Sequence, residues 1–360
     1  MKIYIDSCMQ ADQGTGIGQY TMHLYKNLKE NSVAVELDKY VTKSRGFKKY
    51  FNYLKYINSN NYINHLKDFD VIHYTSFHMP FRKIRNSKTI VTVHDLAFNI
   101  HPETMPKSAV LFSKLMMLNT FSKADTILTV SYSVYNEIKK YYPKYIYKVK
   151  VIYPGIYQNI NTNLKLNSFI NKSLNDLNDF FLYVGTIEYR KNIGIIIDAF
   201  IKLKENNLLA SDYKLVLAGK MGYGSDSFLR IANESQFKND IIFSGFINNN
   251  DCNLLYRKAK AYIFPTCYEG FGSTQLECME NHLPLILSNI KTNIEVSSGY
   301  GLFFDLSDLD SLVDQMSKIV SGDYDYAENN RMADTIINKF QWPVLIRSYI
   351  ACYKNLCHEE

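Results

Sequence analysis

The sequence lacks the cysteine patterns and long apolar runs that mark several classes of protein. Its six cysteines, at positions 8, 252, 267, 278, 352 and 357, include no Cys-x-x-Cys pair and have no histidines at metal-ligand spacing. A disulfide framework and a zinc site are therefore not expected. No stretch approaches the roughly 18 apolar residues that cross a bilayer, and the first residues carry no export signal. These absences indicate a cytoplasmic protein with reduced thiols.

Acidic residues are scarce in the first half of the chain. Residues 1–160 contain 22 Lys and Arg against 11 Asp and Glu, whereas residues 161–360 contain 19 against 24. Residues 39–67 contain no acidic residue, and their basic side chains alternate with aromatic ones. This segment is a candidate for peripheral contact with the anionic inner face of the cytoplasmic membrane. A solvated basic helix in a tyrosine-rich chain is the alternative.

Length and hydrophobic patterning predict two α/β domains. A chain of 360 residues that is 46% hydrophobic can bury two cores of ordinary size. Short β-branched or aromatic runs alternate with helical patterns, which is typical of parallel sheets covered by helices. We expect strands at 2–6, 70–74, 88–94, 125–130 and 148–153, and a second series at 180–185, 213–219, 241–244, 261–264 and 284–288.

The two series define the predicted domain boundaries. Residues 1–158 form an N-terminal Rossmann-like domain, and residues 179–340 form a C-terminal one. Residues 159–178 are rich in Asn and Ser and read as a linker. Residues 340–356 are apolar at helical spacing and predict an amphipathic closing helix.

The strongest local motif is YEGFGSTQLECME, which follows the apolar strand AYIFP. The loop contains Gly270 and Gly272 and leads into a helix whose first backbone amides can bind phosphate. Glu269 and Glu277 bracket this turn at the carboxyl end of a strand, where open α/β sheets bind ligands. Two carboxylates there can hold sugar hydroxyls. The alternative is an ordinary acid before a helix and a solvated one within it.

A second motif places two cations at the predicted start of a helix. In FLYVGTIEYRKNIGIIIDAF, Arg190 and Lys191 follow a strand and a glycine turn. Cations at a helix N-terminus are unfavourable by about 0.3–1 kcal/mol each unless an anion compensates them. A diphosphate would do so, and a solvated Arg-Lys pair is the alternative.

Two further features lie at predicted strand ends in the first half. The segment QGTGIGQY carries Gly14, Gly16 and Gly18, but its G-x-G-x-G spacing departs from the dinucleotide fingerprint. We read it as a loop that approaches a ligand in the interdomain cleft, with a plain glycine turn as the alternative. His94 ends the strand VTVHDLAF and can bond a sugar hydroxyl. Its alternative is a histidine that caps the next segment.

Together these motifs resemble retaining glycosyltransferases of family 4, which have the GT-B fold and are common in the assembly of bacterial surface polysaccharides. The resemblance covers nearly the whole chain, through the glycine loop before Tyr20, VHDLAF, ADTILTVSYSVYNEI, VIYPGI, YVGTIEYRKN, LVLAGK, IIFSGFI, YIFPTCYEGFGSTQLECM and the closing FQW. It implies two Rossmann-like domains that face each other across a cleft. It also implies that the final helix crosses back, so that residues 341–360 join residues 1–158 in the N-terminal domain.

The resemblance also implies roles for individual residues. Glu269 and Glu277 match the E-x7-E pair, the first contacting the donor sugar and the second the nucleotide ribose. Lys191 matches the phosphate lysine, His94 the histidine near the transferred sugar, and Gly16 the loop that approaches the phosphates. The loop that holds the diphosphate matches Phe271, Gly272, Ser273 and Thr274. The strand-end residues Gly185, Thr186, Gly219 and Lys220 complete the expected donor-binding set.

Three departures from the family pattern stand out. Thr186 occupies the position where many members have arginine, so Arg190 is expected to share or assume that phosphate contact. The segment Glu-Asn-His-Leu-Pro-Leu at 280–285 replaces the usual Ala-Cys-Gly-Thr-Pro-Val, and the loop around Ser273 lacks a frequent proline. None of these changes removes the E-x7-E frame.

The expected activity is transfer of a hexose or deoxyhexose, with mannose from GDP-mannose as the first choice, to a glycan or lipid-linked glycan. Arg190, Lys191, His94 and Glu269 form the expected catalytic set, which acts by stabilising charge on the leaving diphosphate. No cofactor or metal is expected, because the Asp-x-Asp pairs lie away from the phosphate loops, and no nucleic-acid partner is expected. The alternatives are a nucleotide-sugar 2-epimerase of related architecture and a non-catalytic scaffold that binds nucleotide or membrane. A nicotinamide-dependent dehydrogenase ranks last.

Overall fold

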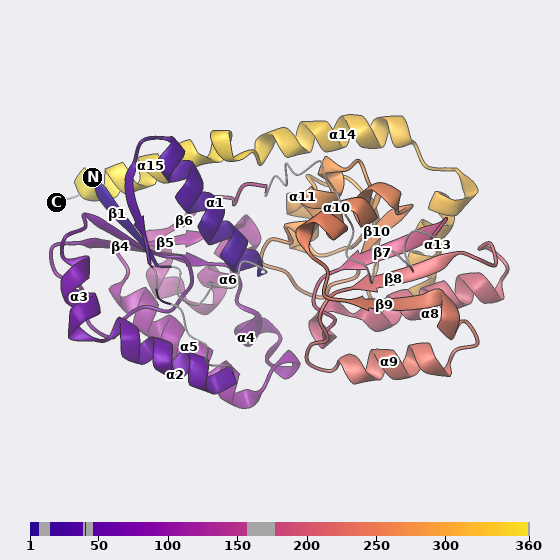
Figure 1. The fold of residues 1–360 in the computed structure, drawn as a ribbon, viewed down its shortest axis with the longest axis horizontal. Coiled ribbons are helices and arrows are strands. Elements are labelled where there is room, and N and C mark those ends of the chain that lie inside the picture. The colour runs from indigo at the N-terminus through magenta and orange to yellow at the C-terminus, as the bar shows by residue number, and fades with distance from the viewer. Residues whose placement is uncertain (7–14, 39, 41–45, 157–176, 359–360) are drawn as a thin grey trace. The chain divides into compact units, whose positions relative to one another are not determined.

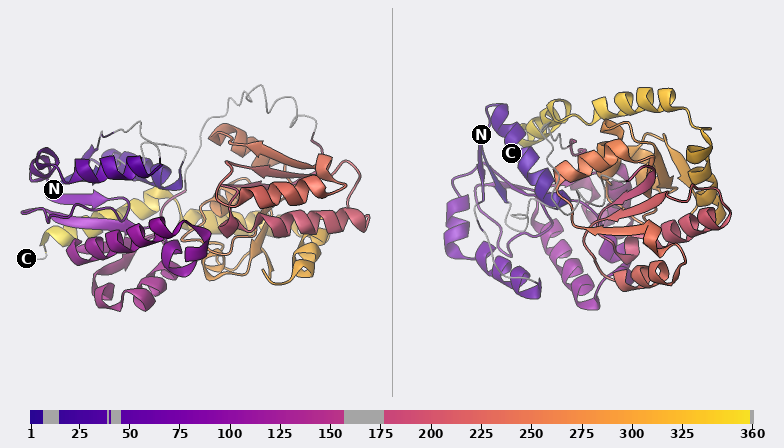
Figure 2. Two further views of the ribbon diagram at one scale, coloured as in Figure 1. Left: turned by 90° about the horizontal axis from the view of Figure 1, so that it is seen from below. Right: turned by 45° about the vertical axis from the view of Figure 1, so that its right-hand side comes forward.

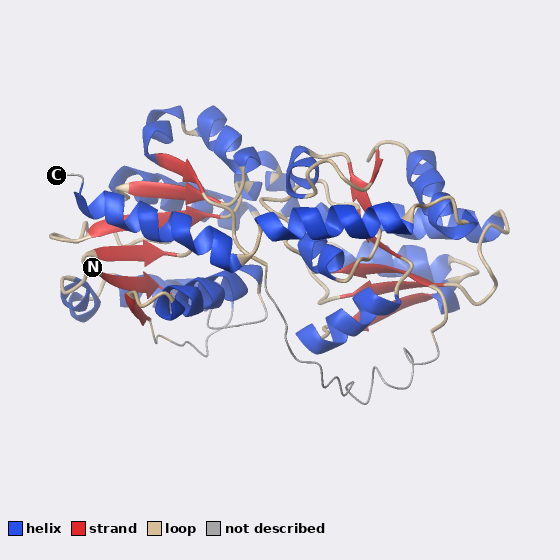
Figure 3. Cartoon of the chain, turned by 90° about the horizontal axis from the view of Figure 1, so that it is seen from above, coloured by secondary structure: helices blue, strands red, loops and turns tan. Residues whose placement is uncertain are grey.

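The computed structural model describes residues 1–6, 15–38, 40, 46–156 and 177–358. The chain separates into two compact units, which we describe one at a time. Unit 1 comprises residues 1–157 with 339–360, and unit 2 comprises residues 158–338. Residues 159–176 of the predicted linker, Gly14 of the predicted glycine loop and most of the side chains of residues 41–50 lie outside the described residues. In both units the strands form an inner layer between helices (Figure 3).

Unit 1 is built on a six-stranded parallel sheet with the order β2-β1-β3-β4-β5-β6 (Figure 1). Its strands are β1 (Lys2–Asp6), β2 (Ala34–Leu37), β3 (Val71–Tyr74), β4 (Lys88–Val93), β5 (Thr126–Thr129) and β6 (Val149–Val151). Its helices are α1 (Gly16–Glu30), α2 (Gly46–Ile57), α3 (Asn60–Leu66), α4 (Ala97–Ile100), α5 (Lys107–Lys123) and α6 (Tyr132–Tyr141), with 3₁₀ turns η2 (Pro102–Thr104) and η3 (Pro143–Lys148).

The closing helix α15 (Trp342–His358) belongs to unit 1 and packs beside α1. Trp342, Tyr349 and Tyr353 share one hydrophobic cluster with Ile3 and Leu24. Figure 2 shows both ends of the described chain in this unit. The closing helix therefore completes the N-terminal core, as the amphipathic pattern of its sequence requires.

Unit 2 repeats the plan with the order β12-β11-β10-β7-β8-β9, again all parallel. Its strands are β7 (Phe180–Val184), β8 (Lys214–Ala218), β9 (Ile241–Gly245), β10 (Ala261–Phe264), β11 (Leu285–Ser288) and β12 (Leu302–Phe304). Its helices are α8 (Ile193–Glu205), α9 (Ser225–Glu234), α10 (Asn249–Lys258), α11 (Thr274–Glu280), α12 (Lys291–Val296), α13 (Leu309–Ser321) and α14 (Tyr326–Lys339), with 3₁₀ turns η4 (Tyr189–Lys191) and η5 (Lys238–Asp240).

The strand order of unit 2 fixes where a ligand can bind. Counted along the unit, the order reads 6-5-4-1-2-3, which is the doubly wound arrangement of nucleotide-binding domains. The order reverses between β7 and β10, which are hydrogen-bonded neighbours. Ligands bind outside the carboxyl ends of the strands at such a switch point. The loops after β7 and β10 are therefore the place to look for a functional site.

Candidate functional site

The loops after β7 and β10 bring oppositely charged side chains together. Lys191, in η4 after β7, donates to Glu269, which lies in the loop after β10. Glu269 also accepts from Thr266 Oγ1 at 2.9 Å. Backbone pairing holds the two loops in place, since Cys267 N donates to Arg190 O at 2.9 Å. Lys191 and Glu269 are 78 residues apart in the sequence. They meet because β7 and β10 are neighbours at the switch point of the sheet.

Burial makes this pair electrostatically strong. The side chains of Lys191 and Glu269 are only 13% and 11% exposed. Burial raises the pKa of Glu269, but the charges of Lys191 and Arg190 outweigh it and hold that pKa below its ordinary value. For Lys191 burial also disfavours the charged form, which lowers the pKa, and the negative charge of Glu269 opposes this shift. The carboxylate is thus ionised at neutral pH, and the lysine carries the charge that balances it.

The guanidinium group of Arg190 forms ion pairs and a hydrogen bond with other groups of the protein. Its Nη2 pairs with Glu188 Oε1 at 2.8 Å, and its Nη1 donates to Tyr268 O at 2.6 Å and lies 3.4 Å from Glu269 Oε1. The sequence predicts Arg190 and Lys191 at the start of a helix. They lie in η4, directly before α8, which begins at Ile193 after an Asn192 with a left-handed backbone. The carboxylates of Glu188 and Glu269 provide the anion that these cations need. Arg190 is therefore placed to position the 268–269 loop.

Glycines end three neighbouring strands of the same sheet. Gly185, Gly219 and Gly245 follow or end β7, β8 and β9, and Gly219 N donates to Gly245 O at 2.9 Å. A Cβ on Gly219 would lie 1.7 Å from Gly185 O, and Gly185 and Gly219 have φ of 152° and 155°. Only glycine fits this close approach. The edge is thus lined by backbone, where a ligand can come close.

The other predicted donor-binding residues flank this edge. Thr186 O accepts from Tyr183 OH at 3.0 Å, and the exposed Lys220 lies over the Phe246 ring with Nζ 4.5 Å from its centroid. Gly272 has φ of 76° and opens the turn before α11. Phe271 is buried, Ser273 is the N-cap residue of α11, and Thr274 Oγ1 accepts from Tyr262 OH at 3.1 Å.

Glu277 differs from Glu269 in its environment. It lies in the first turn of α11 and accepts from Tyr256 OH at 3.0 Å. Burial raises its pKa to about 7; the Tyr256 hydrogen bond opposes this rise, and the charge of Glu280 adds to it. This carboxyl is partly protonated near neutral pH, so it can donate as well as accept a hydrogen bond.

Gly16 and His94 lie in unit 1. Gly16 is the first residue of α1, where Thr15 caps the helix by accepting from Gly18 N at 3.2 Å. His94 follows β4, and its Nε2 lies 2.8 Å from Thr75 O. Since a carbonyl oxygen only accepts, Nε2 carries the proton and Nδ1 is the acceptor. Burial lowers the pKa of His94, so the ring is neutral at pH 7.

A row of buried polar side chains supports His94. Tyr20 meets the His94 ring edge-on, with centroids 5.0 Å apart, and its OH bonds Thr92 Oγ1 at 3.0 Å. The buried His73 joins Thr92 Oγ1 and Tyr353 OH, each at 2.7 Å. The closing helix is thereby connected to the strand that carries His94.

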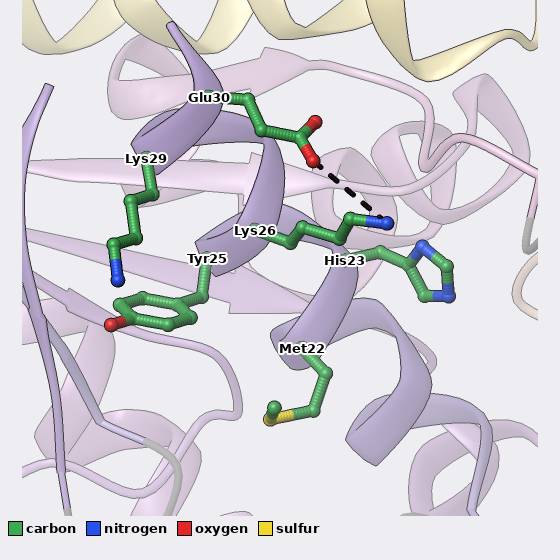
Figure 4. A pocket seen from close by; sticks show the side chains of 6 residues that line it. All are labelled: Met22, His23, Tyr25, Lys26, Lys29 and Glu30. Carbon is green, nitrogen blue, oxygen red and sulfur yellow. Dashed lines mark ion pairs between the residues drawn. The ribbon is translucent and has the colours of Figure 1, made fainter. Parts of the chain in front are cut away.

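A hollow of unit 1 lies along α1. It has a volume of about 510 Å³ and is lined by residues of that helix: Met22, His23, Tyr25, Lys26, Lys29 and Glu30 (Figure 4). Lys26 and Glu30 form an exposed ion pair at 3.8 Å. This hollow contains none of the predicted site residues.

Sequence reasoning missed Glu188, Thr266 and Tyr256. Glu188 lies inside the quoted motif GTIEYRKN, two residues before Arg190, and that spacing was the available signal. Thr266 and Tyr256 carry no local signal, because their partners come from tertiary packing. Among the described residues, no group of three or more His, Cys, Asp or Glu side chains is arranged to hold a metal ion. The expectation of a metal-free reaction stays a prediction.

Comparisons with known proteins identify the family. Residues 15–158 match the family described as Glycosyltransferase Family 4, and residues 167–338 match Glycosyl transferases group 1. The chain is 28% identical over 258 residues to O-antigen chain mannosyltransferase B of Escherichia coli, a match that covers 68% of this chain and 64% of that protein. The match thus spans less than two thirds of this relative.

Solved structures show the same fold. Sucrose-phosphate synthase from Thermosynechococcus elongatus superposes with a TM-score of 0.76 at 16% identity, over 100% of both chains. Anabaena HepE in complex with UDP and glucose gives a TM-score of 0.69 at 15% identity, over 99% of this chain and 100% of that one. The two sheets, the closing helix in unit 1 and the matches to both halves agree: the chain belongs to the family 4 glycosyltransferases with the GT-B fold.

Proposed function

We propose that this protein transfers a hexose or deoxyhexose from a nucleotide-diphosphate sugar to a glycan or lipid-linked glycan of a surface polysaccharide, with retention of anomeric configuration. Mannose from GDP-mannose is our first choice of donor. The similarity to an O-antigen mannosyltransferase supports the sugar and the pathway class. The observation that carries the proposal is the buried Lys191–Glu269 pair at the switch point of unit 2.

The pair suits a pyrophosphate donor. Lys191 has three N–H groups, and Glu269 uses only part of that capacity. A phosphate oxygen beside Nζ would receive a charge-assisted hydrogen bond in a buried setting, where such bonds are strong. As the bond from sugar to phosphate breaks, negative charge grows on the leaving diphosphate, and a fixed cation stabilises that state more than the ground state.

Other residues would hold the rest of the donor. Glu269, kept ionised by its two cations, would bond sugar hydroxyls, and Glu277 would bond the ribose as donor or acceptor. The glycine-lined edge at Gly185 and Gly219 lets the diphosphate approach the backbone. Helix α11 has only seven residues, so we assign the main electrostatic role to Lys191 rather than to the helix terminus. His94 would offer neutral Nδ1 to a hydroxyl of the transferred sugar.

A donor screen followed by a charge-neutral variant tests the proposal. Binding to the folded state raises the melting temperature by mass action, so GDP-mannose should raise it more than UDP- or dTDP-sugars do. Lys191→Gln removes the charge yet can still donate to Glu269, so the fold should remain and kcat should fall about 10²- to 10³-fold. Lys202→Gln, which breaks an exposed ion pair with Asp310, is the matched control.

Two results would overturn the assignment. A Lys191→Gln protein with wild-type kcat would remove the lysine from the reaction. Nuclear magnetic resonance of the product showing inverted anomeric configuration would overturn retention. Lys191→Ala is a poorer probe, because it removes the hydrogen-bond donor of the buried Glu269 as well as its nearest cation and costs about 3–5 kcal/mol of stability.

A further inference from the structure

Helix α5 exposes an apolar stripe on the surface of unit 1. Leu111, Leu115 and Leu118 are 62%, 60% and 48% exposed. Their spacing of four and three residues puts them on one side of the helix. The opposite side packs inward through Met116, Met117, Thr120 and Phe121. The helix thus carries apolar side chains on its outer side as well as on its packed side, whereas an ordinary surface helix has one apolar side, which faces the core.

The stripe is part of a larger face that includes α2 and the loop after β3. The His78 ring lies between Tyr53 of α2 and Phe112 of α5, with centroids 6.1 Å from each. Asn119 of α5 donates to Met79 O at 3.2 Å, and Phe81 N donates to Asn58 Oδ1 at 2.8 Å, just past the end of α2. These contacts join the three segments, and Figure 1 shows α2 and α5 on the same side of the sheet.

Aromatic side chains extend the apolar surface beyond α5. Phe81 is 54% exposed and Phe51 of α2 is 61% exposed. Single exposed apolar residues are ordinary. Several large ones on adjoining elements mark an interaction surface.

The charge of this face has one sign. Residues 46–57, 79–88 and 107–123 contain ten Lys and Arg and no Asp or Glu. The exposed cations include Lys48, Lys55, Arg82, Lys83, Arg85, Lys107 and Lys114. Two bordering carboxylates have partners: Asp125 pairs with Lys83 at 3.2 Å, and Glu103 of η2, which contacts α5, lies 3.0 Å from His101. Such a surface repels a second copy of itself and attracts an anionic one.

We propose that the face formed by α5, the 79–83 loop and α2 docks on an anionic lipid bilayer, with the α5 leucines in the acyl boundary and the cations at the headgroups. Apolar anchors with flanking Lys and Arg are the chemistry of interfacial helices. Long cationic side chains reach from such a depth to the headgroups. No helix in the described part of the chain is both long and apolar enough to cross a bilayer, so the contact is peripheral.

The sequence pointed to residues 39–67 as the membrane contact, whereas the face formed by α5, the 79–83 loop and α2 includes only part of that segment. Much of that segment is used inside the protein: Tyr53 and Ile57 are buried, and Tyr56 OH donates to Asp38 Oδ1 at 3.0 Å. Of its described side chains, Lys48, Phe51 and Lys55 remain exposed on α2. The leucines of α5 provide the apolar anchor.

Sedimentation with vesicles tests the proposal on the full chain. The wild-type protein should sediment with vesicles of phosphatidylglycerol and phosphatidylcholine at 1:1 and stay in solution with phosphatidylcholine alone. The Leu111→Gln, Leu115→Gln, Leu118→Gln triple variant keeps every charge and should bind the anionic vesicles about tenfold more weakly or worse. The Arg82→Gln, Lys107→Gln, Lys114→Gln variant should bind more weakly and lose part of the salt dependence.

A matched control separates this face from general apolar exposure. Leu208, Val320 and Val344 are 49%, 37% and 54% exposed elsewhere on the chain. Changing all three to Gln should leave vesicle binding unchanged. The proposal fails if wild-type protein ignores the anionic vesicles, if the α5 variant binds like wild type, or if the control loses as much. It also fails if the leucines prove to hold a dimer that the α5 variant dissolves. The assay uses no sugar donor, so its outcome is independent of the transfer reaction.

Discussion

The carboxyl groups of Glu269 and Glu277 lie in different electrostatic environments. Glu269 lies between two cations and stays ionised, whereas Glu277 is partly buried beside Tyr256 and has a pKa of about 7. Both belong to the spaced pair that the sequence singled out. The spacing predicts that they lie near one strand end, but it contains no information on which cation or hydroxyl meets each. Those partners come from β7, α10 and their loops.

Glu277 should make stability depend on pH. Its pKa rises from about 4.5 in the unfolded chain to about 7 in the native protein. The native state therefore binds more protons between these values, and the contribution of this carboxyl falls as pH rises from about 4.5 to 7. Glu277→Gln removes the cost of charging it. The variant should match wild type at pH 4.5 and exceed it by about 2–3 kcal/mol at pH 8.

Urea unfolding at several pH values measures this difference. Glu234→Gln changes an exposed glutamate of α9 and serves as the control. Parallel pH profiles for Glu277→Gln and wild type would contradict the assigned burial cost.

At the scale of elements, the closing helix is held by polar as well as apolar contacts. Tyr353 OH bonds the buried His73 at 2.7 Å, and burial lowers the pKa of His73 to about 3. His73 therefore stays neutral and needs partners for both ring nitrogens. Tyr353→Phe removes one and should cost about 1–3 kcal/mol.

Thermal or urea unfolding followed by circular dichroism measures this loss. Tyr147→Phe, at a tyrosine that is 78% exposed, should leave stability unchanged. Equal stability of Tyr353→Phe and wild type would show that the hydroxyl adds nothing to the docking of α15.

The entry to α15 depends on a glycine. A Cβ on Gly155 would lie 2.5 Å from Trp342 Cγ, and the indole is buried. Gly155→Ala must displace the ring and should destabilise unit 1 by about 1–3 kcal/mol. Unfolding followed by Trp342 fluorescence reports the change directly, since the chain has one tryptophan. Gly16→Ala, where a Cβ has open space within 4 Å, is the control, and similar losses in both variants would contradict the clash.

Edge strands were the elements that sequence reasoning missed. Ten strand positions were expected and all ten occur, but β2 and β12 were not expected. Both lie at sheet edges, and β12 has only three residues. β2 is half exposed and contains a glutamate. Central strands are buried on both faces and so read as apolar runs, whereas these two edge strands are too short or too polar to give that signal. The exact start of α8 was also not predicted, because the left-handed backbone of Asn192 makes the helix begin at Ile193.

At the scale of the whole molecule, the two units differ in how the chain builds them. Unit 2 is one continuous segment, residues 158–338, whereas unit 1 combines residues 1–157 with 339–360. The similarity of both halves to glycosyltransferases, and the two strand series, were visible in the sequence. The amphipathic pattern predicted the closing helix, and the family resemblance predicted that this helix belongs to the N-terminal domain.

This difference predicts how fragments behave. Residues 158–338 expressed alone should unfold cooperatively and keep the nucleotide-induced shift in melting temperature, because their core is complete. Residues 1–157 alone lack Trp342, Tyr349 and Tyr353 and should fail to fold cooperatively. Joining them to residues 339–360 by a short Gly-Ser linker should restore the transition, because Ile156 N already bonds Phe340 O at 2.9 Å. A cooperative transition in residues 1–157 alone would contradict this.

The split core also sets an order of events during protein synthesis. Residues of β6 leave the ribosome about 190 residues before Trp342, which at about 5–20 residues per second is about 10–40 s. Throughout that interval the site for α15 on α1 and the sheet has no cover, while unit 2 is translated in full. The domain that is made first thus finishes folding last, and newly made chains would spend this time exposing Tyr20, Leu24 and Leu28 to chaperones.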